Sequence, residues 1–355
     1  MAYTDIDFPA EYFNTLLWTG ADTSSGRDFT GVGFQPDLVW CKTRSDSNGH
    51  KWFDSVRGVG KSIQSESTGA ETTNDGNGYI DSFDADGFSS IAGSLNNYNF
   101  NNTSTTFVAW NWLASNTTAS NTDGSITSTV SANTTSGFSI VSYTGNGSAG
   151  ATVGHGLGAV PKMMIHKDRT TGSYQWGIYT STLGPTKNLN FTSGAENTSS
   201  TYYNDTAPTS SVFSLGTNVG YNANTDSYIA YCFAEIKGYS KFGSYTGNGN
   251  NDGTFVYLGF KPAFVMVKNT VQNSRNWTII DNKRNIFNPE TQWLYPNAAD
   301  AEFNASSYPV DFVSNGFKIR TGAASYFNTS AENYIYMAFA ENPFVTSTSI
   351  PTTAR

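Results

Sequence analysis

The chain of 355 residues contains 15% aromatic and only 14% charged residues, and its formal net charge is −8. The acidic balance and the lack of clustered Lys and Arg argue against a nucleic-acid-binding surface. No apolar run approaches the roughly 20 residues that a membrane-spanning helix requires, and the polar, acidic start does not resemble a signal peptide. A composition rich in aromatic residues, Asn, Thr, Ser and Gly is typical of all-β proteins with many turns.

The chain is predicted to begin with an arm, residues 1–15, which packs on its own chain or on a neighbouring subunit. Three copies of one unit of about 100 residues follow. Each copy opens with an aromatic-Thr-Gly turn, passes through a proline to a strand that ends in Lys, reaches a Trp and closes with an apolar strand.

Regular spacing is the evidence for this repetition. The opening aromatic residue precedes the proline by 18, 18 and 17 residues, and the proline precedes the lysine by 6 residues in every copy. The landmarks are Pro36, Lys42, Trp52, Pro161, Lys167, Trp176, Pro262, Lys268 and Trp277. A period this long excludes a solenoid rung or a propeller blade, so each copy is predicted to be a complete small domain with its tryptophan in the core.

The predicted fold class is all-β, with three tandem antiparallel β-sandwich repeats of jelly-roll-like type. Short apolar runs separated by Asn-Gly and Asp-Gly turns support strands, and helical periodicity is nearly absent. One helical turn is predicted within 286–294. The predicted segments are an arm at 1–15, sandwiches at 16–114, 137–241 and 242–344, a Ser/Thr/Asn-rich linker at 115–136 and a C-terminal tail at 345–355. The linker is expected to be a flexible or extended spacer, in which SITSTVS could form a strand.

Catalytic residues are scarce, and we expect no enzyme. His50, His155 and His166 have no counterparts in the other copies, and Cys41 and Cys232 lie in apolar runs that favour buried thiols. No nucleophile-elbow, zinc-helix or phosphate-loop motif is present. The enzymatic alternative is a carboxylate pair that cleaves glycans, although the spacing selects no pair and solvated loop carboxylates explain the acids as well. The candidates for that pair are Asp281, Glu290, Glu302 and Asp311.

Oxygen-rich side chains gather in the run DGNGYID, where Asp75, Asn77 and Asp81 partly resemble a calcium loop. The run lacks the terminal bidentate Glu of a complete loop, and Asx turns explain the same residues. No cofactor is therefore expected, with Ca²⁺ as the alternative.

Aromatic residues in predicted loops are candidates for binding a glycan or a receptor. Rings can stack on the apolar face of a sugar while Asn and Asp bond its hydroxyls, and loops rich in Tyr and Asn suit adaptable recognition. The alternative is that these rings seal domain or subunit contacts. The candidates are Tyr202, Tyr203, Tyr295, Tyr308, Tyr326 and Phe327.

Several motifs carry a resemblance to a known family. SYTGNG at 142–147, GFKPAFVMVK at 259–268 and YIYMAFAENPF at 334–344 resemble a domain of structural proteins of tailed bacteriophages, particularly marine cyanophages and related podoviruses. The resemblance covers most of the chain. It implies a peripheral virion protein, tail-fibre-like or capsid-decorating, and it transfers no catalytic residue.

We therefore expect a virion structural protein on the surface of the phage particle, a tail or fibre component used in host attachment. The alternatives are a capsid decoration or head fibre and, from a different class, a glycan-cleaving enzyme. Expected partners are further copies of the chain in a homo-oligomer, a trimer, together with other virion proteins and a host cell-surface glycan. No nucleic acid and no membrane insertion are expected. Recognition is expected in the loops that differ most among the copies, around 62–102, 197–206 and 289–308.

Overall fold

The computed structural model describes residues 4–322 and 326–343. Within these residues almost all regular structure is antiparallel β-sheet, with one 3₁₀ turn, η1 (Pro9–Glu11), and one short helix, α1 (Val219–Asn222). The predicted all-β fold class is confirmed. The turn predicted within 286–294 is wrong, because this segment is an irregular loop that leads into a short strand, β24 (Gln292–Trp293). The tail predicted at 345–355 lies outside the described residues.

The first segment, residues 13–112, contains two sheets. Its large sheet has the order β1 (Phe13–Thr19), β9 (Thr106–Trp112), β3 (Leu38–Thr43), β4 (Lys51–Asp54), β5 (Lys61–Gln64) and β6 (Thr72–Thr73). Its small sheet has the order β2 (Arg27–Thr30), β8 (Gly87–Ile91) and β7 (Tyr79–Asp84). Residues of both sheets share one hydrophobic cluster, in which Trp18 from β1 packs against Phe29 from β2 at 4.6 Å between ring centroids. The two sheets are therefore the layers of a sandwich.

The second segment, residues 119–233, has a large sheet of eight strands. Its order is β10 (Ala119–Asn121), β11 (Ser128–Asn133), β12 (Phe138–Thr144), β19 (Ser227–Phe233), β14 (Met163–Asp168), β15 (Gly177–Thr180), β16 (Lys187–Asn190) and β17 (Asn197–Thr198). A small sheet pairs β13 (Ala151–Gly154) with β18 (Val212–Leu215).

The predicted linker at 115–136 is not a free spacer. Its β11 pairs with β12 over six residues, and Val130 is buried, because Ser and Thr alternate there with apolar residues.

The third segment, residues 240–343, has a large sheet with the order β20 (Ser240–Thr246), β28 (Asn333–Pro343), β22 (Phe260–Asn269) and β23 (Thr278–Asp281). Two small sheets accompany it. The first has the order β21 (Phe255–Tyr257), β27 (Gly316–Ile319) and β26 (Val310–Val313), and the second pairs β24 with β25 (Phe303–Asn304).

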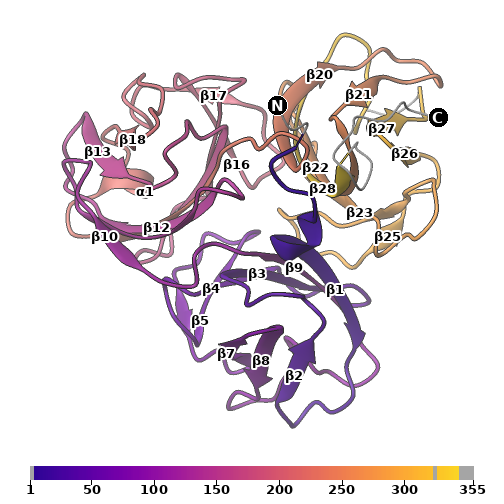
Figure 1. The fold of residues 1–355 in the computed structure, drawn as a ribbon, viewed down its shortest axis with the longest axis horizontal. Helices are drawn as coiled ribbons and strands as arrows, with labels where there is room; N and C mark the ends of the chain where they lie inside the picture. Colours follow the sequence, from indigo (N-terminus) through magenta and orange to yellow (C-terminus); the bar gives the residue numbers. More distant parts are fainter. Residues whose placement is uncertain (1–3, 323–325, 344–355) are drawn as a thin grey trace.

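The three large sheets share a strand order. In each, the opening strand pairs with the closing strand, and the closing strand pairs with the strand that carries the landmark lysine. The segments form three lobes around a common centre (Figure 1). The division into three separate domains with the boundaries given above stays a prediction.

One hydrophobic cluster joins the three lobes, and it contains all three landmark tryptophans. Trp52 of the first segment lies 5.0 Å from Trp176 of the second, measured between ring centroids, and Phe191 of the second lies 5.5 Å from Trp277 of the third. The tryptophans are buried, as predicted, but they pack between segments. The expectation that each closes the core of its own sandwich is therefore corrected, because their rings lie on the sheet faces that meet at the centre.

The described part of the predicted arm packs on its own chain. Thr4 Oγ1 donates a hydrogen bond to the carbonyl of Lys237 at 3.1 Å, and Ile6 is buried in the central cluster. Strand β1 already begins at Phe13, whose ring stacks on Phe339 of β28 at 5.1 Å. The first strand thus ties the first segment to the third, beside β22 and β28 (Figure 1).

Candidate functional site

The six aromatic candidates do not form one exposed platform. Tyr203, Tyr295 and Phe327 are buried, and the other three pack as partly buried residues against the hydrophobic clusters of the second and third segments. In the third segment the rings surround Trp293, with Phe327 at 4.7 Å and Tyr308 at 5.6 Å between centroids. Their loops fold back over the sheets because burial of an aromatic ring stabilises the fold more than exposure does. These rings are therefore buried or half-buried and pack within their own segments.

The calcium-like run is held by protein contacts. Lys51 Nζ lies 2.6 Å from Asp75 Oδ2, and the backbone N–H of Asn77 donates to Asp75 Oδ1 at 2.9 Å, which is an Asx turn. Burial opposes ionisation of Asp75, but the Lys51 ammonium holds its pKa below the ordinary value. Asp81 is exposed on β7. Among the described residues, no three His, Cys, Asp or Glu side chains are grouped to hold a metal ion.

Three of the four carboxylate candidates are ion-paired with arginine. Arg284 donates to Asp281 at 2.6 Å and to Glu302 at 2.9 Å, and Arg44 of the first segment also pairs with Glu302 at 2.7 Å. Near the surface, Asp311 pairs with Arg320. Asp281, Glu302 and Asp311 therefore act in structural ion pairs, and only Glu290 is left as a candidate for chemistry.

The histidines and cysteines are interior residues. His50 accepts a hydrogen bond at Nδ1 from Trp40 Nε1 at 2.9 Å. His166 is enclosed by aromatic rings, and burial lowers its pKa to about 3, so its ring is neutral at physiological pH. Cys41 and Cys232 are free and buried, and burial raises the pKa of both thiols. None of these four side chains reaches a pocket described below.

The segments are fastened to one another in a cycle. A glutamate of each segment donates its backbone N–H to a carbonyl that lies just beyond the lysine-bearing strand of the next segment. These bonds are Glu71 to Arg169 at 3.0 Å, Glu196 to Thr270 at 2.9 Å and Glu302 to Arg44 at 2.7 Å. The side chains of Arg169 and Glu71 add a bidentate ion pair, with distances of 2.9 and 3.1 Å. Each lobe therefore contacts both others.

The landmark lysines belong to the same framework. Lys167 Nζ donates to the carbonyl of Thr68 in the first segment at 2.8 Å, and Lys268 Nζ reaches the carbonyl of Ser193 in the second at 3.5 Å. Lys42 Nζ bonds the carbonyl of its neighbour Thr43 at 2.6 Å. Burial lowers the pKa of all three lysines to about 8. Their role is to hold loop carbonyls.

Glu290 lines a pocket of about 440 Å³ in the third segment. Its side chain is buried, and within the described structure its Oε2 atom has no hydrogen-bond partner. Burial raises the pKa of Glu290 to about 8, so that the carboxyl is largely protonated at neutral pH. Lys261 of β22 and Glu341 of β28 form an ion pair of 2.7 Å that also lines this pocket.

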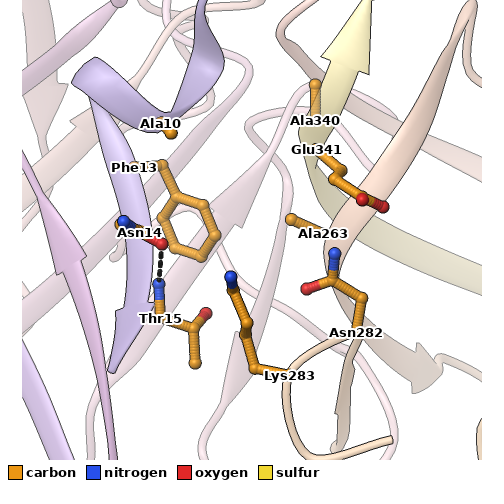
Figure 2. A pocket seen from close by; sticks show the side chains of 9 residues that line it. All are labelled: Ala10, Phe13, Asn14, Thr15, Ala263, Asn282, Lys283, Ala340 and Glu341. Atoms are coloured by element: carbon orange, nitrogen blue, oxygen red, sulfur yellow. Dashed lines mark hydrogen bonds between the residues drawn. The ribbon is translucent and has the colours of Figure 1, made fainter. Parts of the chain in front are cut away.

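A smaller hollow of about 80 Å³ adjoins this pocket at the contact between the first and third segments. Figure 2 shows the Phe13 ring and the Lys283 side chain directed into the space between β1 and the strands of the third segment. Asn282, Lys283 and Glu341 line both hollows, so the two are neighbours. We call the larger hollow, which Glu290 lines, the Glu290 groove.

The sequence pointed to Glu290 only as one of four acids, and it did not single out Phe287 or Asn282. One signal was present, because the run NKRNIFNPE places two consecutive apolar residues in an otherwise polar loop. The groove also overlaps the start of the variable loop around 289–308.

Comparison with known proteins finds one family. The model of a domain of unknown function, DUF7483, matches residues 8–343. No curated protein and no solved structure matches the chain. None of the helices in the described residues is long and apolar enough to cross a membrane.

Proposed function

We propose that this chain, which belongs to the DUF7483 family, is a structural protein on the surface of a tailed-bacteriophage particle, a tail or fibre component used in host attachment. The sequence motifs that resemble phage structural proteins suggest the location. The observation that supports the proposal is the cyclic fastening of the three segments, which joins the described parts of all three into one unit.

Buried polar contacts support a structural role for this unit. Tyr231 of the second segment donates to Asp54 of the first at 2.7 Å, and Trp110 of the first donates to Asp281 of the third at 3.0 Å. Both carboxylates also bind a buried arginine of their own segment. Fully partnered polar groups of this kind resist relative motion of the parts that they join. A protein mounted on a particle needs this rigidity.

The proposal includes no enzymatic activity. Hydrolysis of a glycosidic bond uses two carboxyl groups that flank the sugar, one of them available as a base or nucleophile. Asp281, Glu302 and Asp311 are held by arginines, and Glu341, beside Glu290, is held by Lys261. A capsid decoration uses the same unit, and the site of mounting distinguishes it from a tail component.

Immunogold electron microscopy of purified phage particles tests the proposal, with antibodies raised against the recombinant chain. Label at the tail or fibres supports attachment, and label over the head supports decoration. Recovery of the chain only in the soluble fraction of infected cells, with no label on particles, would overturn both.

The oligomer is tested separately. Within the proposal the chain assembles as a homotrimer, although burial of the central tryptophans already takes place inside a single chain. Light scattering after gel filtration distinguishes one chain of 38.4 kDa from an assembly three times that mass. A single-chain mass at micromolar concentration would contradict the trimer and leave the virion location unaffected.

A further inference from the structure

We propose that the Glu290 groove is a carbohydrate-binding site, in which a pyranose ring lies against Phe287 while its hydroxyls bond Glu290, Asn282 and the neighbouring lysine. The inference deepens the attachment role proposed above and depends on it for its biological meaning. Binding itself can be measured on the isolated chain.

Unpartnered polar atoms mark the floor of the groove. Glu290 is only 3% exposed, yet its Oε2 makes no hydrogen bond to any described residue, and the buried Oδ1 of Asn282 makes none either. A buried oxygen without a partner costs stability, which a ligand that donates hydrogen bonds would recover. Both residues line the same pocket, so rotation of their buried side chains toward it would present both oxygens to one ligand.

An apolar surface stands beside these oxygens. Phe287 is 78% exposed and Ile286 is 74% exposed, the highest values among the large apolar side chains of the described residues. Both line the pocket with Glu290. Exposure of an aromatic ring at the edge of a concave polar site is typical of ligand pockets, which combine apolar walls with a few oriented polar groups.

The loop that carries Phe287 is anchored at both ends. Asn288 Nδ2 donates to the Phe312 carbonyl, and the Phe312 N–H donates to Asn288 Oδ1, at 2.8 Å each. At the other end, buried Arg284 is fixed by Asp281 at 2.6 Å. A ring displayed from an anchored loop loses little conformational freedom on binding, which favours affinity.

The mixture of charges selects a sugar over other ligands. Lys261 and Lys283 line the groove, so they disfavour a metal cation, and Glu341 beside Lys261 disfavours a simple anion. Each hydroxyl group of a sugar can both donate and accept a hydrogen bond. It therefore suits a wall in which amide and carboxyl oxygens accept and lysine ammonium groups donate. The raised pKa of Glu290 adds a further donor at neutral pH.

Titration calorimetry and saturation-transfer NMR on the full chain test the site with glucose, galactose, mannose, N-acetylglucosamine and glucuronate as probes. At least one probe should bind with a Kd of about 1 mM or tighter, a typical strength for a small ligand with few contacts. Phe287→Ala and Glu290→Ala should each weaken that binding about tenfold or more. Phe255→Ala is the matched control, because this ring is 44% exposed in the same segment and does not line the pocket.

Three outcomes would overturn the proposal. The first is that no probe binds at roughly 100 mM, a concentration about a hundredfold above the expected Kd of about 1 mM. The second is that Phe287→Ala leaves the binding of the sugar unchanged. The third is that the chain binds CaCl₂ and that this binding requires Glu290. Glu290→Gln keeps the size of the side chain and serves if the alanine variant does not fold. Sugar binding by a chain that is absent from particles would retain the site and overturn the virion role. Label on particles without sugar binding would do the reverse.

Discussion

Trp110 and Asp281 stand 171 positions apart in the chain, and the indole Nε1 of the first donates a hydrogen bond to Oδ2 of the second at 3.0 Å. Arg284 binds the same oxygen at 2.6 Å, and its guanidinium carbon lies 5.6 Å from the centroid of the Trp110 ring. Three side chains from two segments thus form one buried unit. Because both Asp281 and Arg284 are fully buried, neither can exchange its partner for water.

Replacement of Asp281 should therefore destabilise the whole protein. Asp281→Ala leaves the Arg284 charge with Glu302 as its remaining acidic partner, and we expect a loss of about 3–5 kcal/mol in the free energy of unfolding. Urea denaturation followed by tryptophan fluorescence measures the loss. Asp311→Ala is the control, because Arg320, its partner, is 54% exposed, and it should cost less than about 1 kcal/mol. Equal losses in the two variants would contradict the assignment.

The shared core predicts that the three lobes unfold together. Trp52 and Trp176 belong to different segments and lie 5.0 Å apart, and Trp176 Nε1 donates to the Gln64 carbonyl at 2.7 Å. Trp176→Ala should cost about 3–5 kcal/mol and lower a single melting transition without splitting it. Calorimetry provides the measurement. Three separate transitions in the unmodified protein would show that the lobes are independent.

The pH dependence of stability should carry a contribution from Glu290. Burial, together with the charge of Asp281, raises its pKa from 4.5 to about 8, while Arg284 and Lys261 oppose the rise and Glu341 adds to it. Between these values the folded protein holds a proton that the unfolded chain has released. The free energy of unfolding should therefore fall as the pH rises through this window and level off above it.

Glu290→Gln removes this contribution. The variant should match the unmodified protein near pH 4.5 and exceed its stability at pH 8. At about 1.4 kcal/mol per pKa unit, the rise from 4.5 to about 8 corresponds to about 5 kcal/mol, and solvent in the open pocket reduces the expected difference to roughly 1–3 kcal/mol. Guanidinium denaturation at a series of pH values gives both curves. Parallel curves for the two proteins would mean that Glu290 ionises normally.

The Thr-Gly-Asn-Gly turns should depend on a buried asparagine. In the second segment Asn222 donates from Nδ2 to the carbonyls of Ser148 and Gly216 at 2.9 Å each, and its Oδ1 accepts from the Asn146 N–H at 2.9 Å. Asn222→Ala leaves these groups unpaired, so we expect a loss of about 2–4 kcal/mol, whereas exposed Asn224→Ala should change little. Thermal melting compares the two, and equal effects would contradict the role given to Asn222.

By itself the sequence determined the all-β class, the strands that carry the landmark lysines and the burial of the landmark tryptophans. These properties are local, because turn residues and alternating apolar positions specify where a strand lies and which faces it buries. The repeated spacing around Pro262, Lys268 and Trp277 likewise anticipated a strand, β22, that ends near a buried tryptophan.

Only the tertiary structure decided what those buried faces meet. Alternation along a strand does not say which other sheet covers it, so Trp176 was assigned to its own sandwich although it packs against Trp52. The same holds for the loops, because whether Tyr295 turns inward depends on Phe303 and Tyr326, which come from other parts of the third segment. The Glu290 groove was beyond reach for the same reason, since its walls come from β22, β26, β28 and the loop that carries Phe287, which lie far apart in the sequence and meet only in the folded third segment.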